Sequence, residues 1–299
     1  SVIGNDHPSP CYNALKMSLE ILLARSAGFC FGVKKAIEKA ETLDGEVPIF
    51  GYLIHTPQEV ERLRAKGKRN VHELSDVGSG RVVVTAHGLD IHKLDSLKDG
   101  QREVIDTTCP LVTRIYREGW KMQDKGARVV IIGDPDHVEV KGIASRMKDP
   151  IIVYHEEDLE RVPTDRPIGI ICQSTLLMEK WKKFTDLLTS RCRVIDAVDT
   201  ICKPTKDRQS AAEELAQSVD VMLVVGGYNS SNTSKLREVC ARYLGEARTH
   251  HIERPEEIVP DWFSDDMRVG VTAGASTPDY VIQAVIERVR ALDPVSVVE

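Results

Sequence analysis

The sequence lacks the features that mark several common classes of protein. It has no run of about 20 apolar residues, so it predicts no membrane-spanning helix. Its charged residues are mixed in sign and give a net charge of −6, which argues against a nucleic acid as the main partner. It has only seven cysteines in 299 residues, too few for a disulfide scaffold, and we therefore expect a reduced, cytoplasmic setting.

Two phosphate-binding motifs and a targeting signal are missing as well. There is no Gly-x-x-x-x-Gly-Lys loop, and no Gly-x-Gly-x-x-Gly follows a strand. The first residues carry neither a basic segment nor a long apolar segment, so they do not resemble a secretory signal. We interpret residues 1–19, which include Cys11, as a disordered or cloning-derived lead-in.

Three cysteines share one sequence context. Cys30, Cys109 and Cys202 each follow a short apolar run and precede a helix-like pattern, and Pro110 suits the first turn of such a helix. At a strand-to-helix turn a cysteine lies near the positive end of the helix dipole, which favours its thiolate. Because thiolates bind soft metals, we expect these three residues to meet at one centre. Small core residues are the better interpretation of Cys172, Cys192 and Cys240.

The chain from Leu22 onward can be laid out as three approximate copies of one unit. In each copy a strand leads to a cysteine and a helix, and two further apolar strands end in polar turns. Short β-branched runs that alternate with helical patterns indicate parallel sheets covered on both faces. We therefore predict an α/β fold of three small parallel-sheet domains in a pseudo-threefold arrangement. Their expected ranges are residues 31–109, residues 110–201, and residues 20–30 together with 202–299. The helical patterns include residues 57–66, 140–147 and 234–243.

The polar turns predict an anion-binding site. Ligands of parallel sheets bind at the carboxyl ends of the strands, where these turns lie. His55 lies 25 residues after its cysteine, and His137 and Ser230 each lie 28 residues after theirs. Imidazole, hydroxyl and amide groups donate hydrogen bonds to phosphate oxygens, and helix N-termini add their dipoles, so a diphosphate is a suitable ligand. The candidate binding residues are His55, His87, His137, Ser174, Ser230, Ser231, Asn232 and Ser276.

The spacing of the three cysteines indicates which metal centre they hold. They lie 79 and 93 residues apart, without the Cys-x-x-Cys pair of a zinc site. A cubane iron–sulfur cluster normally takes four cysteines, so three would leave one iron free to bind a substrate oxygen as a Lewis acid. Such a centre joins electron delivery to cleavage of a carbon–oxygen bond. The reaction also needs a proton donor, for which Glu139 is the candidate.

These residues resemble the motifs of the 4-hydroxy-3-methylbut-2-enyl diphosphate reductase family. The resemblance extends from about Leu22 to Arg290 and is in register in all three units. The matching motifs are Gly28-Phe-Cys-Phe-Gly-Val33, Thr85-Ala-His-Gly88, Asp106-Thr-Thr-Cys-Pro-Leu-Val112, His137-Val-Glu-Val-x-Gly142, Asn229-Ser-Ser-Asn232 and Gly270-Val-Thr-Ala-Gly-Ala-Ser276.

The resemblance implies a fold, a cofactor and a reaction. The family is a cloverleaf of three α/β domains around an oxygen-sensitive [4Fe–4S] cluster, one per chain, with one iron not ligated by cysteine. It catalyses the last step of the methylerythritol phosphate route to isoprenoids, in which the C4 hydroxyl is removed reductively to give isopentenyl and dimethylallyl diphosphate. The electrons come from ferredoxin or flavodoxin. The chain itself would be a monomer or a homodimer.

The resemblance also assigns roles to individual residues. It makes Cys30, Cys109 and Cys202 the cluster ligands and Glu139 the proton donor. Ser174 would help to hold the alcohol of the substrate and to relay the proton. The remaining contacts, mainly to the diphosphate, would come from His55, His87, His137, Ser230, Ser231, Asn232 and Ser276.

The sequence departs from the family pattern at three positions. Thr56 stands where we expect Asn. Val138 replaces the Pro of a His-Pro-Glu motif, which we expect to leave the loop that carries Glu139 less rigid. Ser174 replaces Thr and keeps the hydroxyl but not the methyl group that restricts its rotamer, so we expect weaker positioning with the chemistry retained.

Two other interpretations stay open. A non-catalytic iron–sulfur sensor or divergent paralogue would keep the scaffold and the cysteines but needs no acid, so the presence of Glu139 favours the reductase. A cluster-dependent dehydratase would use the open iron without net electron transfer. A requirement for an external reductant distinguishes the reductase from it.

Overall fold

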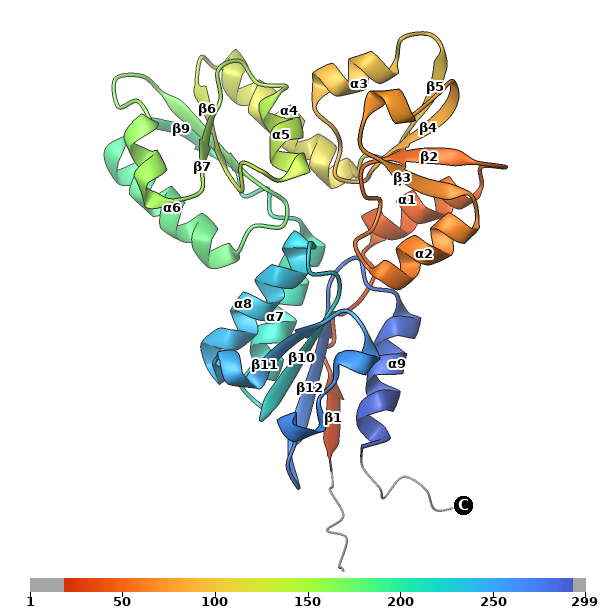
Figure 1. Ribbon diagram of the computed structural model, residues 1–299. Coiled ribbons are helices and arrows are strands. Elements are labelled where there is room, and N and C mark those ends of the chain that lie inside the picture. Colours follow the sequence, from red (N-terminus) through yellow and green to blue (C-terminus); the bar gives the residue numbers. More distant parts are fainter. Residues whose placement is uncertain (1–18, 293–299) are drawn as a thin grey trace, which may run out of the picture.

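The structure, a computed structural model, describes residues 19–292 and forms three lobes around a common centre (Figure 1). The lead-in predicted over residues 1–19, with Cys11, lies outside the described residues except for Leu19. Within this part of the chain no helix has both the length and the apolar character needed to cross a membrane. Each lobe is one four-stranded parallel sheet with helices packed on it, so the predicted α/β fold of three units is confirmed.

The first two lobes have the same strand order. The first sheet, in the order β3-β2-β4-β5, comprises β2 (Val47–Phe50), β3 (Lys68–Val71), β4 (Gly80–Val84) and β5 (Arg102–Asp106). The first lobe carries the helices α1 (Phe31–Glu41), α2 (Pro57–Ala65) and α3 (Ile91–Leu97). The second sheet, in the order β7-β6-β8-β9, comprises β6 (Arg128–Ile132), β7 (Ile151–Val153), β8 (Ile168–Cys172) and β9 (Val194–Ala197). The second lobe carries α4 (Pro110–Asp124), α5 (Val138–Ala144) and α6 (Met178–Arg191).

The third lobe repeats this order with one strand taken from the start of the chain. Its sheet, in the order β11-β10-β12-β1, comprises β1 (Glu20–Leu23), β10 (Val221–Val225), β11 (Thr249–Ile252) and β12 (Arg268–Ala273). Its helices are α7 (Lys203–Ala216), α8 (Ser231–Leu244) and α9 (Asp279–Arg290). Strand β1 therefore holds the edge position that β5 and β9 hold in the other sheets. Short 3₁₀ helices cover Leu74–Asp76, Glu156–Arg161, Glu246–Arg248, Pro255–Glu257 and Pro260–Trp262.

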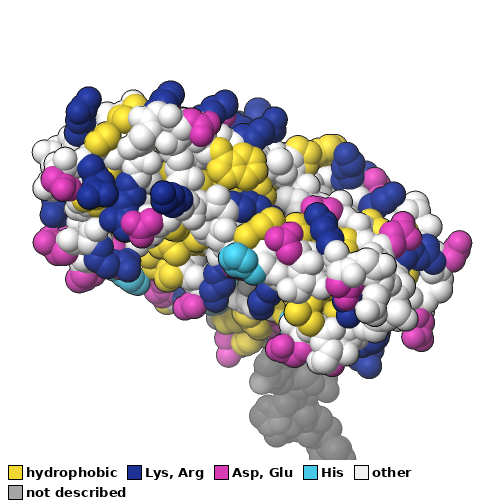
Figure 2. Space-filling view, turned by 90° about the horizontal axis from the view of Figure 1, so that it is seen from above, with side chains coloured by type: hydrophobic (Ala, Val, Ile, Leu, Met, Phe, Trp, Pro, Cys, Tyr) yellow, Lys and Arg dark blue, Asp and Glu magenta, His cyan; other side chains and the backbone are white. Residues whose placement is uncertain are grey.

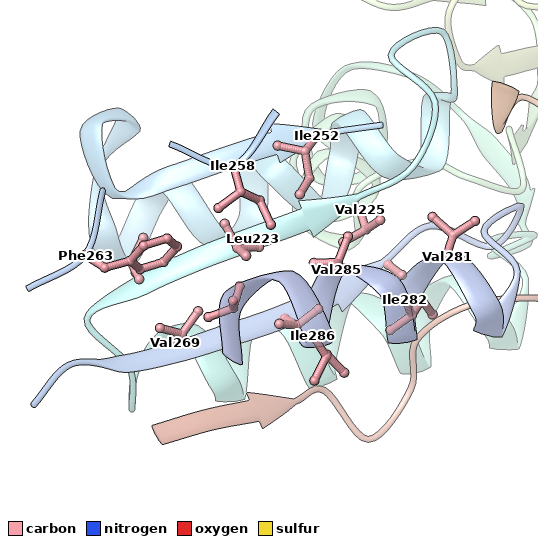
Figure 3. Packing of buried hydrophobic residues seen from close by; sticks show 14 residues of the cluster. Leu223, Val225, Ile252, Ile258, Phe263, Val269, Val281, Ile282, Val285 and Ile286 are labelled. Atoms are coloured by element: carbon pink, nitrogen blue, oxygen red, sulfur yellow. The ribbon is translucent and has the colours of Figure 1, made fainter. Parts of the chain in front are cut away.

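The central strands of each sheet are largely buried on both faces, as expected for parallel strands flanked by helices. Strand β10 is buried along its whole length. In the third lobe, Val285 and Ile286 of α9 pack with Leu223 and Val225 of β10 (Figure 3). On the outside, Lys and Arg side chains are interspersed with Asp and Glu on the face shown in Figure 2. The apolar layers hold the carboxyl ends of the central strands toward the meeting point of the lobes.

Two of the three predicted helices begin earlier in the structure than expected. The helix predicted over residues 57–66 is confirmed as α2, one residue shorter. The bounds 140–147 and 234–243 are wrong, because α5 begins at Val138 and α8 at Ser231. The reason is capping: His137 Nδ1 accepts a hydrogen bond from the Glu139 N–H, and Ser230 Oγ accepts one from the Thr233 N–H. Residues predicted in turns thus start helices.

Candidate active site

The three cysteines occupy equivalent places in the fold. Cys30, Cys109 and Cys202 are the N-cap residues of α1, α4 and α7, each just after the edge strand β1, β5 or β9. The N–H of each cysteine donates to a carbonyl in the turn after a central strand: Cys30 to Ala275 (3.0 Å), Cys109 to Ala86 (2.9 Å) and Cys202 to Ser174 (3.0 Å). All three line one cavity between the lobes. A shared cavity is what the prediction of one common centre requires.

Gly32 allows the first two cysteine turns to approach each other. A Cβ atom on Gly32 would lie 2.7 Å from the Cys109 sulfur, closer than real Cβ contacts. The absence of a side chain in the first turn of α1 therefore lets the Cys109 sulfur pack against the helix that Cys30 caps.

On the sequence-based expectation that the three cysteines hold an iron–sulfur centre, Gly32→Ala should displace the Cys109 sulfur and lower the iron content of the purified protein severalfold. Iron and sulfide analysis after anaerobic purification measures the effect. Gly78→Ala is a matched control for glycine replacement, because nothing lies within 4 Å of its Cβ position, although its φ of 69° adds local strain. Full iron loading in Gly32→Ala would show that this close approach is not needed.

The protonation of two of the thiols is governed mainly by burial. Burial raises the pKa of Cys202 to about 11 and also raises that of Cys109, although the Leu111 and Val112 N–H groups lower the latter. The N–H groups at the helix starts favour the thiolates as expected, but they do not offset the effect of burial in these two residues without metal. Desolvation outweighs the dipole, so a cation would have to displace the protons.

Glu139 lies in the first turn of α5 and is almost completely buried. Ser174 holds both carboxyl oxygens: its N–H donates to Oε1 at 2.6 Å and its Oγ donates to Oε2 at 2.7 Å. Burial raises the pKa of Glu139, and the two hydrogen bonds offset this only in part. The raised pKa favours the protonated carboxyl group, as a proton donor requires. Val138 is the first residue of α5 and Ser174 holds the carboxyl group, while the expected loss of rigidity at Val138 stays a prediction.

Three histidines form a row beside this acid. The ring centres of His55 and His87 lie 5.5 Å apart, and those of His87 and His137 lie 5.8 Å apart. Burial lowers the pKa of His55 and of His137 to about 4. The pKa of His87 is also lowered well below its usual value, first by burial and then by its two neighbours. All three rings are therefore neutral at pH 7 in the ligand-free protein.

Several polar atoms in the cavity have no hydrogen-bond partner among the described residues. They are His55 Nδ1, His87 Nδ1, both amide atoms of Asn232, and Ser276 Oγ. Buried polar groups in native proteins are nearly always paired, and an unpaired group is costly. These atoms belong to residues that line the same cavity as the cysteines and Glu139. The group therefore fits a polar ligand that supplies the missing partners.

The remaining predicted residues come from the start of α8. Ser230 caps this helix, and the Ser231 hydroxyl lies 3.1 Å from the Thr175 hydroxyl across the boundary between the second and third lobes. The N-terminus of a helix of this length directs N–H groups and positive potential into the cavity. All of the predicted site residues line the cavity: Cys30, His55, His87, Cys109, His137, Glu139, Ser174, Cys202, Ser230, Ser231, Asn232 and Ser276.

Sequence reasoning missed three residues of the site region. Thr175 links Gln173 to Ser231, and Thr205 places its hydroxyl 3.1 Å from the Cys202 sulfur. Thr205 follows Cys202 by three residues, and this spacing in the first turn of a helix could have predicted that the two side chains lie close together. Thr56, noted only as a departure, is fully buried, and its hydroxyl donates to the Ser276 carbonyl at 2.7 Å. It thereby ties the turn after β12 to the first lobe.

A cavity of this kind, lined by residues of three α/β lobes and carrying thiols, a buried acid and unpaired donors, defines an enzyme for a small polar substrate. The chain belongs to the LytB family: the family model described as LytB protein matches residues 21–290. The resemblance found in the sequence is thus confirmed.

Relatives with assigned names match nearly the whole chain. A protein of Geobacter metallireducens is 41% identical over 279 residues, which cover 92% of this chain and 98% of the relative. One of Geobacter sulfurreducens is 40% identical with the same coverage, and one of Nitratiruptor is 39% identical over 92% of this chain and 99% of its own. All three are named 4-hydroxy-3-methylbut-2-enyl diphosphate reductase.

Solved structures give the same fold. A structure described as (E)-4-hydroxy-3-methyl-but-2-enyl diphosphate reductase, the terminal enzyme of the non-mevalonate pathway, is 34% identical with a TM-score of 0.67; the match covers 92% of this chain and all of that one. The corresponding reductase of Plasmodium falciparum has a TM-score of 0.84 at 23% identity and covers 90% of this chain and 87% of its own. The latter supports the fold alone.

Proposed function

We propose that this chain is a 4-hydroxy-3-methylbut-2-enyl diphosphate reductase, the last enzyme of the methylerythritol phosphate route. The substrate, two electrons and two protons give isopentenyl or dimethylallyl diphosphate and one water. The names of the relatives support the substrate and the reaction. The observation that carries the proposal is the set of unpartnered buried polar atoms on His55, His87, Asn232 and Ser276 beside Glu139.

The three cysteines fit the iron–sulfur centre that the family implies. Within residues 19–292 no three His, Cys, Asp or Glu side chains form a site for a single metal ion. Three thiols from three separate helix starts instead suit a polynuclear centre, in which each thiolate binds a different iron. We propose that Cys30, Cys109 and Cys202 hold one [4Fe–4S] cluster. When bound, it would supply electrons and, at the iron without a cysteine, a Lewis acid.

The three-lobed arrangement supports the domain ranges proposed for the chain. Each cysteine lies between the edge strand of one lobe and the first helix of the next lobe, which it caps. We therefore propose domains over residues 31–109, residues 110–201, and residues 20–30 with 202–299. The electron donor is proposed to be a small carrier such as ferredoxin or flavodoxin, and the chain to act as a monomer or homodimer in the cytoplasm.

Glu139 and Ser174 supply the proton. The raised pKa of Glu139 favours the protonated form of the carboxyl group. The Ser174 hydroxyl lies 2.7 Å from Oε2, so it can pass a proton from the acid to an alcohol bound beside it. Protonation turns the hydroxyl of the substrate into water, a much better leaving group than hydroxide.

The histidine row and the start of α8 bind the diphosphate. Neutral His55 and His87 each offer a ring nitrogen without a partner, and Asn232 and Ser276 add an amide and a hydroxyl. The N-terminus of α8 adds positive potential. Neutral donors bind the anion without the repulsion that three charged rings would create in the empty site.

Binding of the diphosphate is expected to take up protons. A bound anion favours the charged form of a neighbouring histidine, so it raises pKa values that lie near 4 in the free protein. At pH 6 to 7 the rings are neutral before binding and partly protonated after it. Calorimetric titration with the substrate in buffers of different ionisation enthalpy measures this uptake.

Variants identify the groups that take up the protons. The uptake should fall in His55→Asn and in His137→Asn, and it should be unchanged in His72→Asn, whose side chain is exposed outside the cavity. Equal uptake in all three variants would show that the histidine row does not titrate on binding.

Ser174→Thr is expected to keep activity within about threefold of the wild type, because the hydroxyl that contacts Glu139 is retained and the added methyl restricts its rotamer. Ser174→Ala should lose far more, since it removes the only side-chain hydrogen bond to Oε2 among the described residues. Steady-state rates of the two variants decide the matter. Similar losses in both would show that the hydroxyl is not part of the proton path.

The decisive experiment for the function is anaerobic purification followed by iron and sulfide analysis and a turnover assay. The protein should contain iron and inorganic sulfide, and it should convert the diphosphate alcohol only when a reductant is supplied. Turnover without reductant would indicate a dehydratase. A bound cluster with no turnover under any reductant would indicate a sensor.

A further inference from the structure

Arg208 connects two of the cysteine turns. It lies in the second turn of α7, only 4% exposed. Its Nη1 donates to the Pro204 carbonyl at 2.8 Å, and its Nε donates to the Gly28 carbonyl at 3.2 Å, which Nη2 also contacts. Pro204 lies two residues after Cys202, and Gly28 lies two residues before Cys30. The guanidinium group therefore bridges the backbones that carry these cysteines.

The positive charge of Arg208 has no acidic partner. Its hydrogen bonds go to neutral carbonyl groups, and among residues 19–292 no carboxylate forms an ion pair with it. A buried charge without a counter-charge is strongly unfavourable in a folded protein. Burial lowers the pKa of Arg208, whereas negative charge on Cys30, Cys202 or Asp207 raises it. The missing anion is thus expected on the cysteine side of the guanidinium group.

The equivalent positions in the other lobes show that packing does not require a cation here. Arg208 follows its cysteine by six residues. The residues six positions after Cys30 and Cys109 are Ala36 and Ile115, both buried in hydrophobic clusters. The three helices bury the same face toward their sheets, so an apolar residue is the default at this position. The third lobe alone places a buried charge there.

We propose that Arg208 provides a fixed positive charge beside the iron–sulfur centre held by Cys30 and Cys202 and thereby raises its reduction potential. This inference rests on the proposed function. A cluster that gains one electron becomes more negative by one charge, and a nearby cation in a poorly solvated site stabilises that reduced state. The same contacts hold the two cysteine turns at a fixed separation, so Arg208 is a positioning residue as well.

The test compares Arg208→Gln, which removes the charge, with Arg208→Lys, which keeps it but cannot bridge both carbonyl groups in the same way. The midpoint potential of the loaded protein is measured by titration with dithionite, followed by electron paramagnetic resonance. In Arg208→Gln we expect the one-electron equilibrium to shift at least tenfold toward the oxidised centre. This corresponds to a midpoint potential lower by about 59 mV. Arg208→Lys should stay close to the wild type.

Controls separate charge from structure. Arg191→Gln removes the same charge from an exposed position at the end of α6, where Arg191 pairs with Glu160, and should leave the potential unchanged. Iron content and thermal unfolding of each variant report the structural role. If Arg208→Gln does not hold iron, the midpoint potential of Arg208→Lys is the test. A potential near that of the wild type supports the effect of the charge, and a lowered potential overturns the inference.

The inference is overturned by an unchanged potential in Arg208→Gln, or by equal losses in the Gln and Lys variants, which would show that geometry and not charge matters. Failure of the proposed function is a different result, because wild-type protein would then lack iron and sulfide or show no reductant-dependent turnover. A loaded, active wild type whose potential ignores Arg208 refutes only this inference.

Discussion

Glu139→Gln is expected to lower turnover by about 10² to 10⁴-fold, the usual contribution of a general acid. Gln has nearly the same shape and can still accept the hydrogen bond from the Ser174 N–H, which meets Oε1 at 2.6 Å in the wild type. It cannot deliver a proton to the departing hydroxyl. Binding of the substrate and iron content should therefore stay near the wild type, while the rate of the chemical step falls. Steady-state and single-turnover rates measure this loss.

A matched control is Glu118→Gln, which removes an acid on α4 that pairs with Lys121 outside the cavity. It should leave turnover unchanged. Full activity in Glu139→Gln, with the cluster intact, would remove Glu139 from the mechanism and leave its buried position and its two hydrogen bonds from Ser174 without a catalytic explanation.

Cys109→Ser should abolish the iron–sulfur absorbance and most of the bound iron. A serine oxygen is a harder ligand than a thiolate sulfur, and a serine hydroxyl is a far weaker acid than a thiol. It is therefore a poor ligand for a centre that needs soft thiolates. Activity should be lost with the cluster. Thermal stability of the protein purified anaerobically should also fall, because metal binding contributes to the free energy of folding.

Cys192→Ser is the matched control, because this thiol lies at the end of α6 and does not line the cavity. It should keep full iron and turnover. Unchanged absorbance and iron content in Cys109→Ser would show that Cys109 is not a ligand.

Much of the fold could be predicted because the strands that carry the site are uniformly apolar. Residues Val129 to Ile132 and β10 are buried on both faces, and such runs are visible in the sequence. The edge strands that lead to the cysteines were predicted, but those at the opposite edges, β3, β7 and β11, were not. Strand β3 has the sequence Lys-Arg-Asn-Val and is held by pairing with β2, because an edge strand has no need of apolar side chains on both faces.

The site could be predicted because its residues follow a threefold repeat of turns. The repeat could not predict how burial changes the pKa values of the site residues. The raised pKa of Cys202 and the lowered pKa of His55 depend on desolvation, which no local motif reveals. The contact between Thr56 and the Ser276 carbonyl joins residues 220 positions apart, and Arg208 breaks the apolar pattern of its helix. Both became visible only when the lobes were assembled.

The position of β1 bears on how the protein is made. In the described fold this strand pairs only with β12, so β1 has no partner until β12, which lies far along the chain, has been translated. The turn at Cys30 also waits, since its N–H donates to Ala275. A shortened product that stops before β12 would present the other two thiols without the third. Synthesis thus delays assembly of the three-thiol site until the third lobe has closed.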